Sequence, residues 1–107
     1  MVLDARFAVI ASVSLDGAYP SVFNVARAKA RTALNFGAAT ADLAGRIKPE
    51  SQAALLAVEP GMMFIGGGVP IRRGGELIGS IGVSGGSAEQ DSECAQHALD
   101  AVDWEQG

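Results

Sequence analysis

The sequence predicts an α/β (α+β) fold in which helices pack on an antiparallel sheet, within a single domain that spans residues 1–107. Two observations predict it. A strand, a glycine turn and a helix start follow one another within residues 76–90, and the pair Gly74-Gly75 joins two strand-like runs as a two-residue hairpin does. A chain of this length can bury one core.

Residues 76–83 are predicted to form the central strand of the sheet. Apolar side chains there are interrupted by Gly79 and Gly82, as in a strand that another backbone approaches closely. After the glycine turn, Ser87 and Gln90 have the spacing of a capping box, so a helix is expected to start at Ser87. One side of this helix should carry Asp91, Cys94, Ala95, Ala98, Ala101 and Val102.

The first part of the chain predicts a strand and then an amphipathic helix. Residues 7–15 are largely apolar with partial alternation, which favours a strand, and Asp16-Gly17 is a turn dipeptide. Ser21 is the expected N-cap of a helix that begins at Val22. Gly37 is placed to end this helix in the left-handed conformation.

The middle of the chain predicts two short helices and two strands. Thr40 is expected to cap a helix over residues 41–47, and Pro49 to open another that reaches Leu56. Residues 62–65 are a candidate for a short buried strand. Residues 69–73 form the first strand of the hairpin, and a proline within them indicates a sheet edge.

Composition and charge exclude several classes of function. The net charge of −4 and the lack of a Lys/Arg cluster argue against a nucleic-acid partner. No run approaches the roughly 18 apolar residues of a membrane span, so no membrane partner and a cytoplasmic, soluble protein are expected. The single cysteine, Cys94, cannot form an internal disulfide, and we expect it to be a buried structural residue.

Several stretches together resemble the GlcG/HbpS-like domain family, which also occurs at the C-terminus of PduO-type proteins. They are Leu15-Asp16-Gly17-Ala18, Ala28-Lys29-Ala30-Arg31-Thr32-Ala33, Gly67-Gly68-Val69-Pro70-Ile71 and Ile78-Gly79-Ser80-Ile81-Gly82-Val83-Ser84-Gly85-Gly86, followed by Gln90-Asp91. The resemblance implies a profilin-like fold, assembly into homo-oligomers, and binding of haem or a corrinoid with weak haem-degrading activity in several members.

The chain departs from this family pattern at its front. Family members usually carry a further N-terminal helix and strand before the Asp-Gly-Ala turn, whereas only about fifteen residues precede that turn here. We therefore expect one sheet edge or helix-packing surface to need cover, and a partner subunit is the expected cover.

The glycine turn is the first candidate ligand site. The segment Ser84-Gly85-Gly86-Ser87 places backbone N–H groups at a helix N-terminus, where a carboxylate or phosphate of a small anionic ligand is favoured. The alternative is that these glycines serve backbone geometry alone, since Glu89 and Asp91 already complement the helix dipole. Gly67 and Gly68 are also candidate ligand-binding residues, in a second stretch of mobile or tightly approached backbone.

Lys29 and Thr32 lie three residues apart on the first long helix, within the family's Lys-Ala-x-Thr-Ala pattern. The resemblance implies that the lysine meets an acidic ligand group. From the residues alone, a solvated lysine and a threonine bonded back to its own helix are the favoured interpretation.

Haem would need an axial ligand, and the sequence assigns none. His97 is the only histidine and lies about 110° from the centre of the apolar stripe, so a solvent-facing or interface position is expected. Tyr19, Met62 and Met63 are the other candidates. The Arg72-Arg73 pair is expected to protect an edge strand with charge, although it could meet a propionate.

No complete catalytic constellation is present: the sequence has no Ser/His/acid set, no Cys/His pair and no metal-binding cluster. The leading hypothesis is a small homo-oligomeric domain that binds haem or a related tetrapyrrole. One alternative is an enzyme that acts on a small carboxylated or hydroxylated metabolite at the glycine turn. Another is an assembly module without a ligand.

Overall fold

The computed structural model describes residues 1–15 and 17–101. The turn expected at Asp16 and the apolar position expected at Val102 lie outside the described residues. The elements are β1 (Val2–Asp4), β2 (Val9–Ala11), α1 (Pro20–Phe36), α2 (Thr40–Arg46), α3 (Pro49–Val58), β3 (Gly68–Arg73), β4 (Glu76–Gly82) and α4 (Ala88–Asp100). The strands form one antiparallel sheet in the order β2-β1-β4-β3, which confirms the predicted fold class and the inner position of β4.

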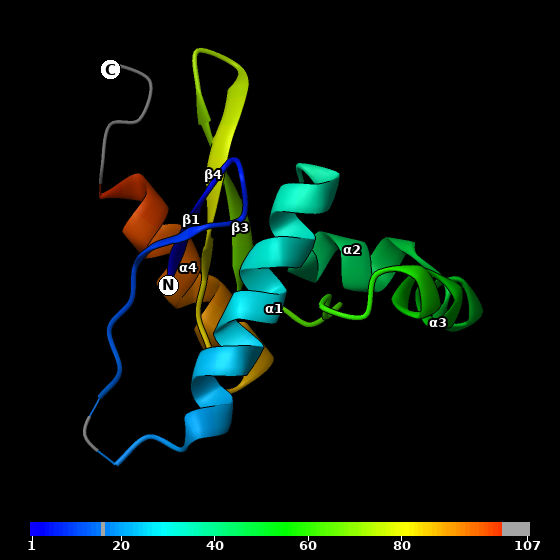
Figure 1. The fold of residues 1–107 in the computed structure, drawn as a ribbon, viewed down its shortest axis with the longest axis horizontal. Helices are drawn as coiled ribbons and strands as arrows, with labels where there is room; N and C mark the ends of the chain where they lie inside the picture. The colour runs from blue at the N-terminus through cyan, green and yellow to red at the C-terminus, as the bar shows by residue number, and fades with distance from the viewer. Residues whose placement is uncertain (16, 102–107) are drawn as a thin grey trace.

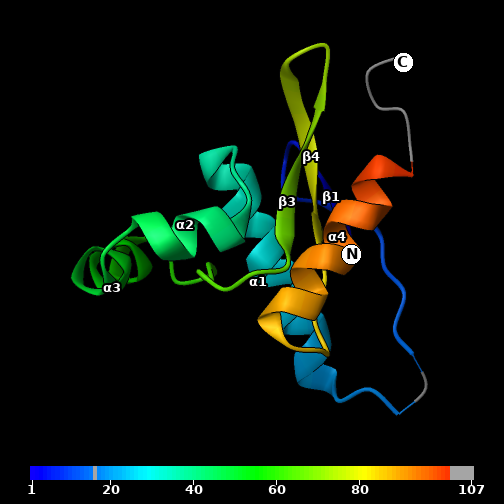
Figure 2. The ribbon, with the colours of Figure 1, turned by 180° about the vertical axis from the view of Figure 1, so that it is seen from behind.

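Helices α1 and α4 cover opposite faces of the sheet, while α2 and α3 extend to one side (Figures 1 and 2). The alternation of side chains along β4 explains this layering. Ser80 faces α1, because its hydroxyl donates to the Ala30 carbonyl at 2.7 Å. Ile81 faces the other way, into a core cluster with Ala95 of α4.

Glycines allow α1 to lie directly against the sheet. A Cβ atom added to Gly82 would run into the Ala26 carbonyl of α1, and one added to Gly68 would run into the Lys29 carbonyl. The prediction that another backbone approaches this strand is therefore correct at Gly82, and at Gly79 the approaching backbone is that of Leu3 in β1.

The predicted hairpin, the start of α4 and the end of α1 are confirmed. Gly74 and Gly75 have φ of 60° and 84° and connect paired residues Arg73 and Glu76, as a two-residue turn with both central φ positive requires. Ser87 caps α4 through the expected capping box with Gln90. Gly37 ends α1 with φ 61° and ψ 32°, in the left-handed region.

The predicted strand at residues 7–15 is wrong over most of its length. Only Val9–Ala11 is a strand, and it pairs with β1, an element that the sequence analysis missed. A tight turn separates the two, because the Asp4 carboxylate accepts from the N–H groups of Arg6 and Ala8. Residues 12–15 continue as a loop with exposed side chains.

Four further features differ from the predictions. Helix α1 begins at Pro20, and its N-cap is Tyr19 rather than Ser21. Thr40 lies inside α2, where its buried hydroxyl accepts from the Gly68 N–H at 2.9 Å instead of capping the helix. Residues 62–65 form no strand, although Met62 is buried in a second core cluster whose other buried members are Leu43 and Phe64. The short helix predicted from Pro49 is present as α3 and ends two residues later than expected.

None of the helices within the described residues is both long and apolar enough to cross a membrane.

Candidate functional site

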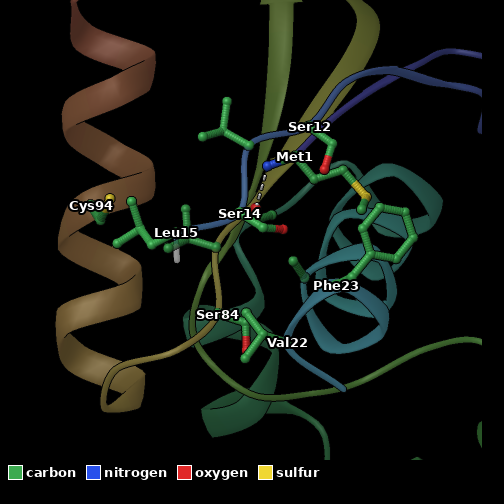
Figure 3. A pocket seen from close by; sticks show the side chains of 12 residues that line it. Met1, Ser12, Ser14, Leu15, Val22, Phe23, Ser84 and Cys94 are labelled. Carbon is green, nitrogen blue, oxygen red and sulfur yellow. Dashed lines mark hydrogen bonds between the residues drawn. The ribbon is translucent and has the colours of Figure 1, made fainter. Parts of the chain in front are cut away.

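Two adjoining cavities open at the end of β4, between the start of α1, the loop that follows β2, and α4 (Figure 3). Their volumes are 590 and 270 Å³. We call them together the α1–α4 pocket. Both cavities are lined by Val13, Ser14, Leu15, Val22, Val83, Ser84 and Cys94.

Each wall of the pocket comes from a different part of the chain. The loop after β2 supplies Leu15, whose side chain extends toward Cys94 of α4, and α1 supplies Val22 and Phe23 on the other side (Figure 3). The glycine turn after β4 closes the larger cavity with Ser84, Gly85 and Gly86. The lining is mainly aliphatic, and its polar groups are serine hydroxyls, the Cys94 thiol and, in the larger cavity, the side chains of Tyr19, Gln90 and Asp91. Such a composition is typical of sites for apolar ligands with polar edges.

Beneath the glycine turn, Lys29 of α1 forms a buried ion pair with Asp91 of α4. The Lys29 Nζ lies 2.9 Å from Asp91 Oδ2, and the two side chains are 3% and 5% exposed. Lys29 also donates to the Val83 carbonyl at 3.1 Å, while the other carboxylate oxygen of Asp91 accepts from the Gly86 N–H at 3.0 Å. The pair thus ties both ends of the turn segment 83–86 to the two helices.

Gly67 makes room for this ion pair. Its φ is 135°, and an added Cβ would lie 2.5 Å from the Val83 carbonyl oxygen and 2.9 Å from Lys29 Nζ. Its own carbonyl accepts from the Val83 N–H at 2.8 Å, which continues the sheet one step beyond the end of β4. The glycine stretch that precedes β3 is therefore a site of close backbone approach.

Two N–H groups of the glycine turn, those of Gly86 and Ser87, are satisfied within the chain. Asp91 holds the Gly86 N–H, and Gln90 Oε1 accepts from the Ser87 N–H at 2.9 Å. The Gln90 N–H in turn donates to Ser87 Oγ at 3.1 Å. An anion at this helix start would compete with these internal acceptors for the N–H groups of Gly86 and Ser87.

The predicted site residues fall into two groups. Ser84, Gly85 and Gly86 line the α1–α4 pocket, and Ser87 caps the helix beside it. Lys29, Thr32, Gly67 and Gly68 are buried and do not line it. The interpretation of Lys29 as a solvated lysine is wrong. Thr32 does bond back to the Ala28 carbonyl, at 2.7 Å, and its oxygen also accepts from the Met63 N–H.

Two groups that can ligate haem iron line the larger cavity: Tyr19, which is 78% exposed, and Cys94. The expectation that Cys94 is buried is wrong, because the thiol lies on the exposed side of α4. Its spacing of three from Asp91 is the signal that could have placed it at the pocket. His97 is exposed and Met62 is a core residue, and neither lines the pocket.

Two further charged groups are the Arg72 guanidinium, which lies away from the pocket, and the Met1 amino group, which lines it. Arg72 lies at the far end of β4, where its guanidinium donates to the carbonyls of Gly37 and Gly75. Met1 lines the smaller cavity, and its amino group donates to the Gly82 carbonyl at 2.9 Å. Burial lowers the pKa of this amino group, and the nearby Cys94 thiol partly opposes that shift.

In the part of the chain that the structure describes, no group of three or more His, Cys, Asp and Glu residues could hold a metal ion.

Comparisons with proteins of known sequence identify relatives. A protein of Citrobacter freundii called "Uncharacterized 15.0 kDa protein in dhaT-dhaS intergenic region" is 32% identical over 88 residues, which are 80% of this chain and 62% of the relative. The corrinoid adenosyltransferase PduO of Salmonella typhimurium is 41% identical over 78 residues, which are 69% of this chain and 23% of PduO. The chain thus spans less than two thirds of the length of these relatives.

Solved structures show the same fold. A PduOC–haem complex superposes with a TM-score of 0.85 at 31% identity, over 98% of this chain and 79% of that one. The Klebsiella pneumoniae protein ORFY gives 0.84 at 30% identity, over 95% and 74%. A double mutant of HbpS from Streptomyces reticuli gives 0.82 at 32% identity, over 95% and 68%.

The model of one protein family, described as "Haem degrading protein HbpS-like", matches residues 1–100. This match takes in all four strands and every residue that lines the α1–α4 pocket. The chain belongs to the HbpS-like family.

Proposed function

We propose that this chain binds haem, or a related tetrapyrrole or corrinoid, in the α1–α4 pocket. The observation that carries the proposal is the PduOC–haem complex, which shares the fold over 98% of this chain at 31% identity. The relative PduO is a corrinoid adenosyltransferase, and the HbpS-like family is described as haem-degrading, so both concern the same class of macrocycle.

The residues of the pocket fit such a group. Its larger cavity, at 590 Å³, lies within the range of about 300–1,000 Å³ that is usual for small-molecule sites. Aliphatic side chains such as Leu15, Val22 and Val83 offer the apolar contact that a macrocycle needs. Tyr19 and Cys94 offer an oxygen and a sulfur, either of which could bind the iron.

In this proposal each residue has a limited task. Tyr19 or Cys94 holds the iron, while Leu15 and Val22 exclude water from the ring. The Lys29–Asp91 pair keeps the turn segment 83–86 in place as one wall, and Asp91 also lines the larger cavity. When bound, haem would supply the redox chemistry that weak haem degradation requires, and the protein supplies position and environment.

The proposal includes a homo-oligomer, and the exposed apolar residues near the pocket support it. Val9 and Ile10 of the edge strand β2 are 41% and 63% exposed, and Val13 and Leu15 of the following loop are 87% and 80% exposed. Apolar surface next to an open strand edge is typical of a surface that another subunit covers.

A hemin titration of the purified protein, followed in the visible spectrum and on a calibrated sizing column, tests the proposal. Saturable binding with a shifted Soret band by an oligomer is expected. Ser84→Trp, which fills the pocket, should weaken binding at least about tenfold, the effect of losing about 1.4 kcal/mol. Ser51→Trp, on exposed α3, is the matched control and should bind as the wild type does.

Variants of the iron donors separate the two candidates. Tyr19→Phe or Cys94→Ser should shift the Soret maximum of the complex, whereas His97→Ala should leave it unchanged. An unsaturable titration without a spectral shift would overturn the tetrapyrrole proposal. An oligomer that shows this behaviour would favour the assembly module instead.

A further inference from the structure

A further cavity lies on the other side of α1. It has a volume of 320 Å³ and is lined by Asn24, Arg27, Ala28, Arg31, Pro60 and Gly61. We call it the arginine pocket. On a helix, residues 24, 27, 28 and 31 share one face, and the residues of α1 that line the α1–α4 pocket occupy the opposite face. The two cavities are therefore separate sites.

The guanidinium of Arg31 is held in place but incompletely paired. It lies over the Phe7 ring, 5.2 Å from its centroid, and against Gly61, where an added Cβ would be 2.9 Å from Arg31 Nε. The Nε–H is buried and has no hydrogen-bond partner. Its acidic neighbour Glu59 lies 3.8 Å from Nη2, which is beyond hydrogen-bond distance.

Arg27 lies one turn earlier on the same face and makes no ion pair or hydrogen bond with another described residue. Two like charges four residues apart disfavour a helix. This pair also stands in a chain whose net charge is −4, so it does not belong to a generally basic surface. A bound anion would offset the repulsion between Arg27 and Arg31 and would lie beside the unpaired Arg31 Nε–H.

We propose that the arginine pocket binds the phosphate group of a small molecule. Two guanidinium groups can meet the oxygens of one phosphate in the forked geometry that arginine favours, and the Asn24 amide can add a further donor. Phosphate fits better than a carboxylate, because its second charge balances the second arginine. The cavity is smaller than the α1–α4 pocket, and its polar lining suits the phosphate rather than a macrocycle.

Titration of the hemin-free protein with inorganic phosphate at constant ionic strength, followed by backbone amide NMR, tests this site. Saturable shifts that cluster at residues 24–31 and Gly61 are expected. Arg27→Gln should weaken binding about tenfold or more, since a charge-assisted hydrogen bond is lost. Arg27 is exposed, so this variant should fold normally, and Arg46→Gln at the exposed end of α2 is the matched control.

Glu59→Gln sharpens the test, because it removes the carboxylate that lies 3.8 Å from Arg31 Nη2. It should tighten phosphate binding, whereas a structural role of the Arg31–Glu59 pair alone predicts lower stability and no change in affinity. Acetate should bind at least about tenfold more weakly than phosphate, for want of the second charge. Binding that Arg27→Gln leaves unchanged, shifts that cluster elsewhere, or equal binding of acetate would overturn the proposal.

Discussion

Lys29 and Asp91 are 62 residues apart in the chain, yet their charged atoms meet at 2.9 Å in a buried position between α1 and α4. The two helices cover opposite faces of the sheet, so this contact passes around its end, where Gly67 leaves the space. Buried charges are tolerated when they are paired and hydrogen-bonded. Both charges meet these conditions through Val83 and Gly86.

Lys29→Met should therefore be strongly destabilising. The change leaves the Asp91 carboxylate buried without its cation, and the loss of one partner from a buried pair typically costs about 3–5 kcal/mol. Urea unfolding followed by circular dichroism measures the free energy of unfolding.

Two further variants control this measurement. Lys48→Met changes an exposed lysine and should alter the free energy of unfolding by less than about 0.5 kcal/mol. Lys29→Met combined with Asp91→Leu should regain much of the lost stability, because an apolar pair no longer holds a stranded charge. A single Lys29→Met variant as stable as Lys48→Met would contradict the role of the pair.

Gly67→Ala should also destabilise the protein. A backbone at φ 135° costs a non-glycine residue about 1–3 kcal/mol, and the new methyl group would press on the Val83 carbonyl and Lys29. Gly45→Ala is the control, since nothing lies within 4 Å of its added Cβ in α2. It should be stabilising by about 0.5–1 kcal/mol. Thermal unfolding of both variants checks the opposite signs.

Ser87→Ala should lower the free energy of unfolding by about 1 kcal/mol, because the Gln90 N–H loses its acceptor at the start of α4. Ser21→Ala is matched in chemistry but lies within α1 and makes no cap, so an effect within about 0.5 kcal/mol is expected. Equal losses in urea unfolding would show that the cap contributes nothing specific.

Cys94 should react with a thiol reagent such as DTNB in the native protein, without denaturant, because its side chain is exposed. Saturation with hemin should slow this reaction, since the thiol lines the α1–α4 pocket. Reactivity that appears only after unfolding would contradict the exposed position. A reaction rate unaffected by saturating hemin would instead show that hemin binds outside the α1–α4 pocket.

The predictable parts of the fold are those encoded by neighbouring residues. Gly74-Gly75 specifies the hairpin and Ser87 with Gln90 specifies the start of α4, because both signals act over two or three residues. Strand β1 was missed since three residues carry no periodicity, and their pairing with β4 depends on residues far along the chain.

The site was less predictable for the same reason. The burial of Lys29 depends on Asp91, a partner on a different helix, and no local pattern reveals it. Cys94 was assigned to the core from the habit of its residue type, whereas the loop at residues 12–15 leaves that side of α4 open as a cavity. The resemblance of the glycine turn to a family motif located one wall of the pocket, but not the other two.

Because α1 packs closely against the sheet, residues at that contact tolerate fewer substitutions than residues at the rim of the pocket. At Gly68 and Gly82 any larger side chain would meet a backbone carbonyl of α1, which cannot move aside as a side chain can. Few substitutions are therefore expected to be accepted at these glycines during evolution. The rim of the α1–α4 pocket has no such constraint at Val13, Leu15 and Tyr19, all of them largely exposed. New ligand preferences are expected to arise at that rim, while the glycines beneath α1 stay unchanged.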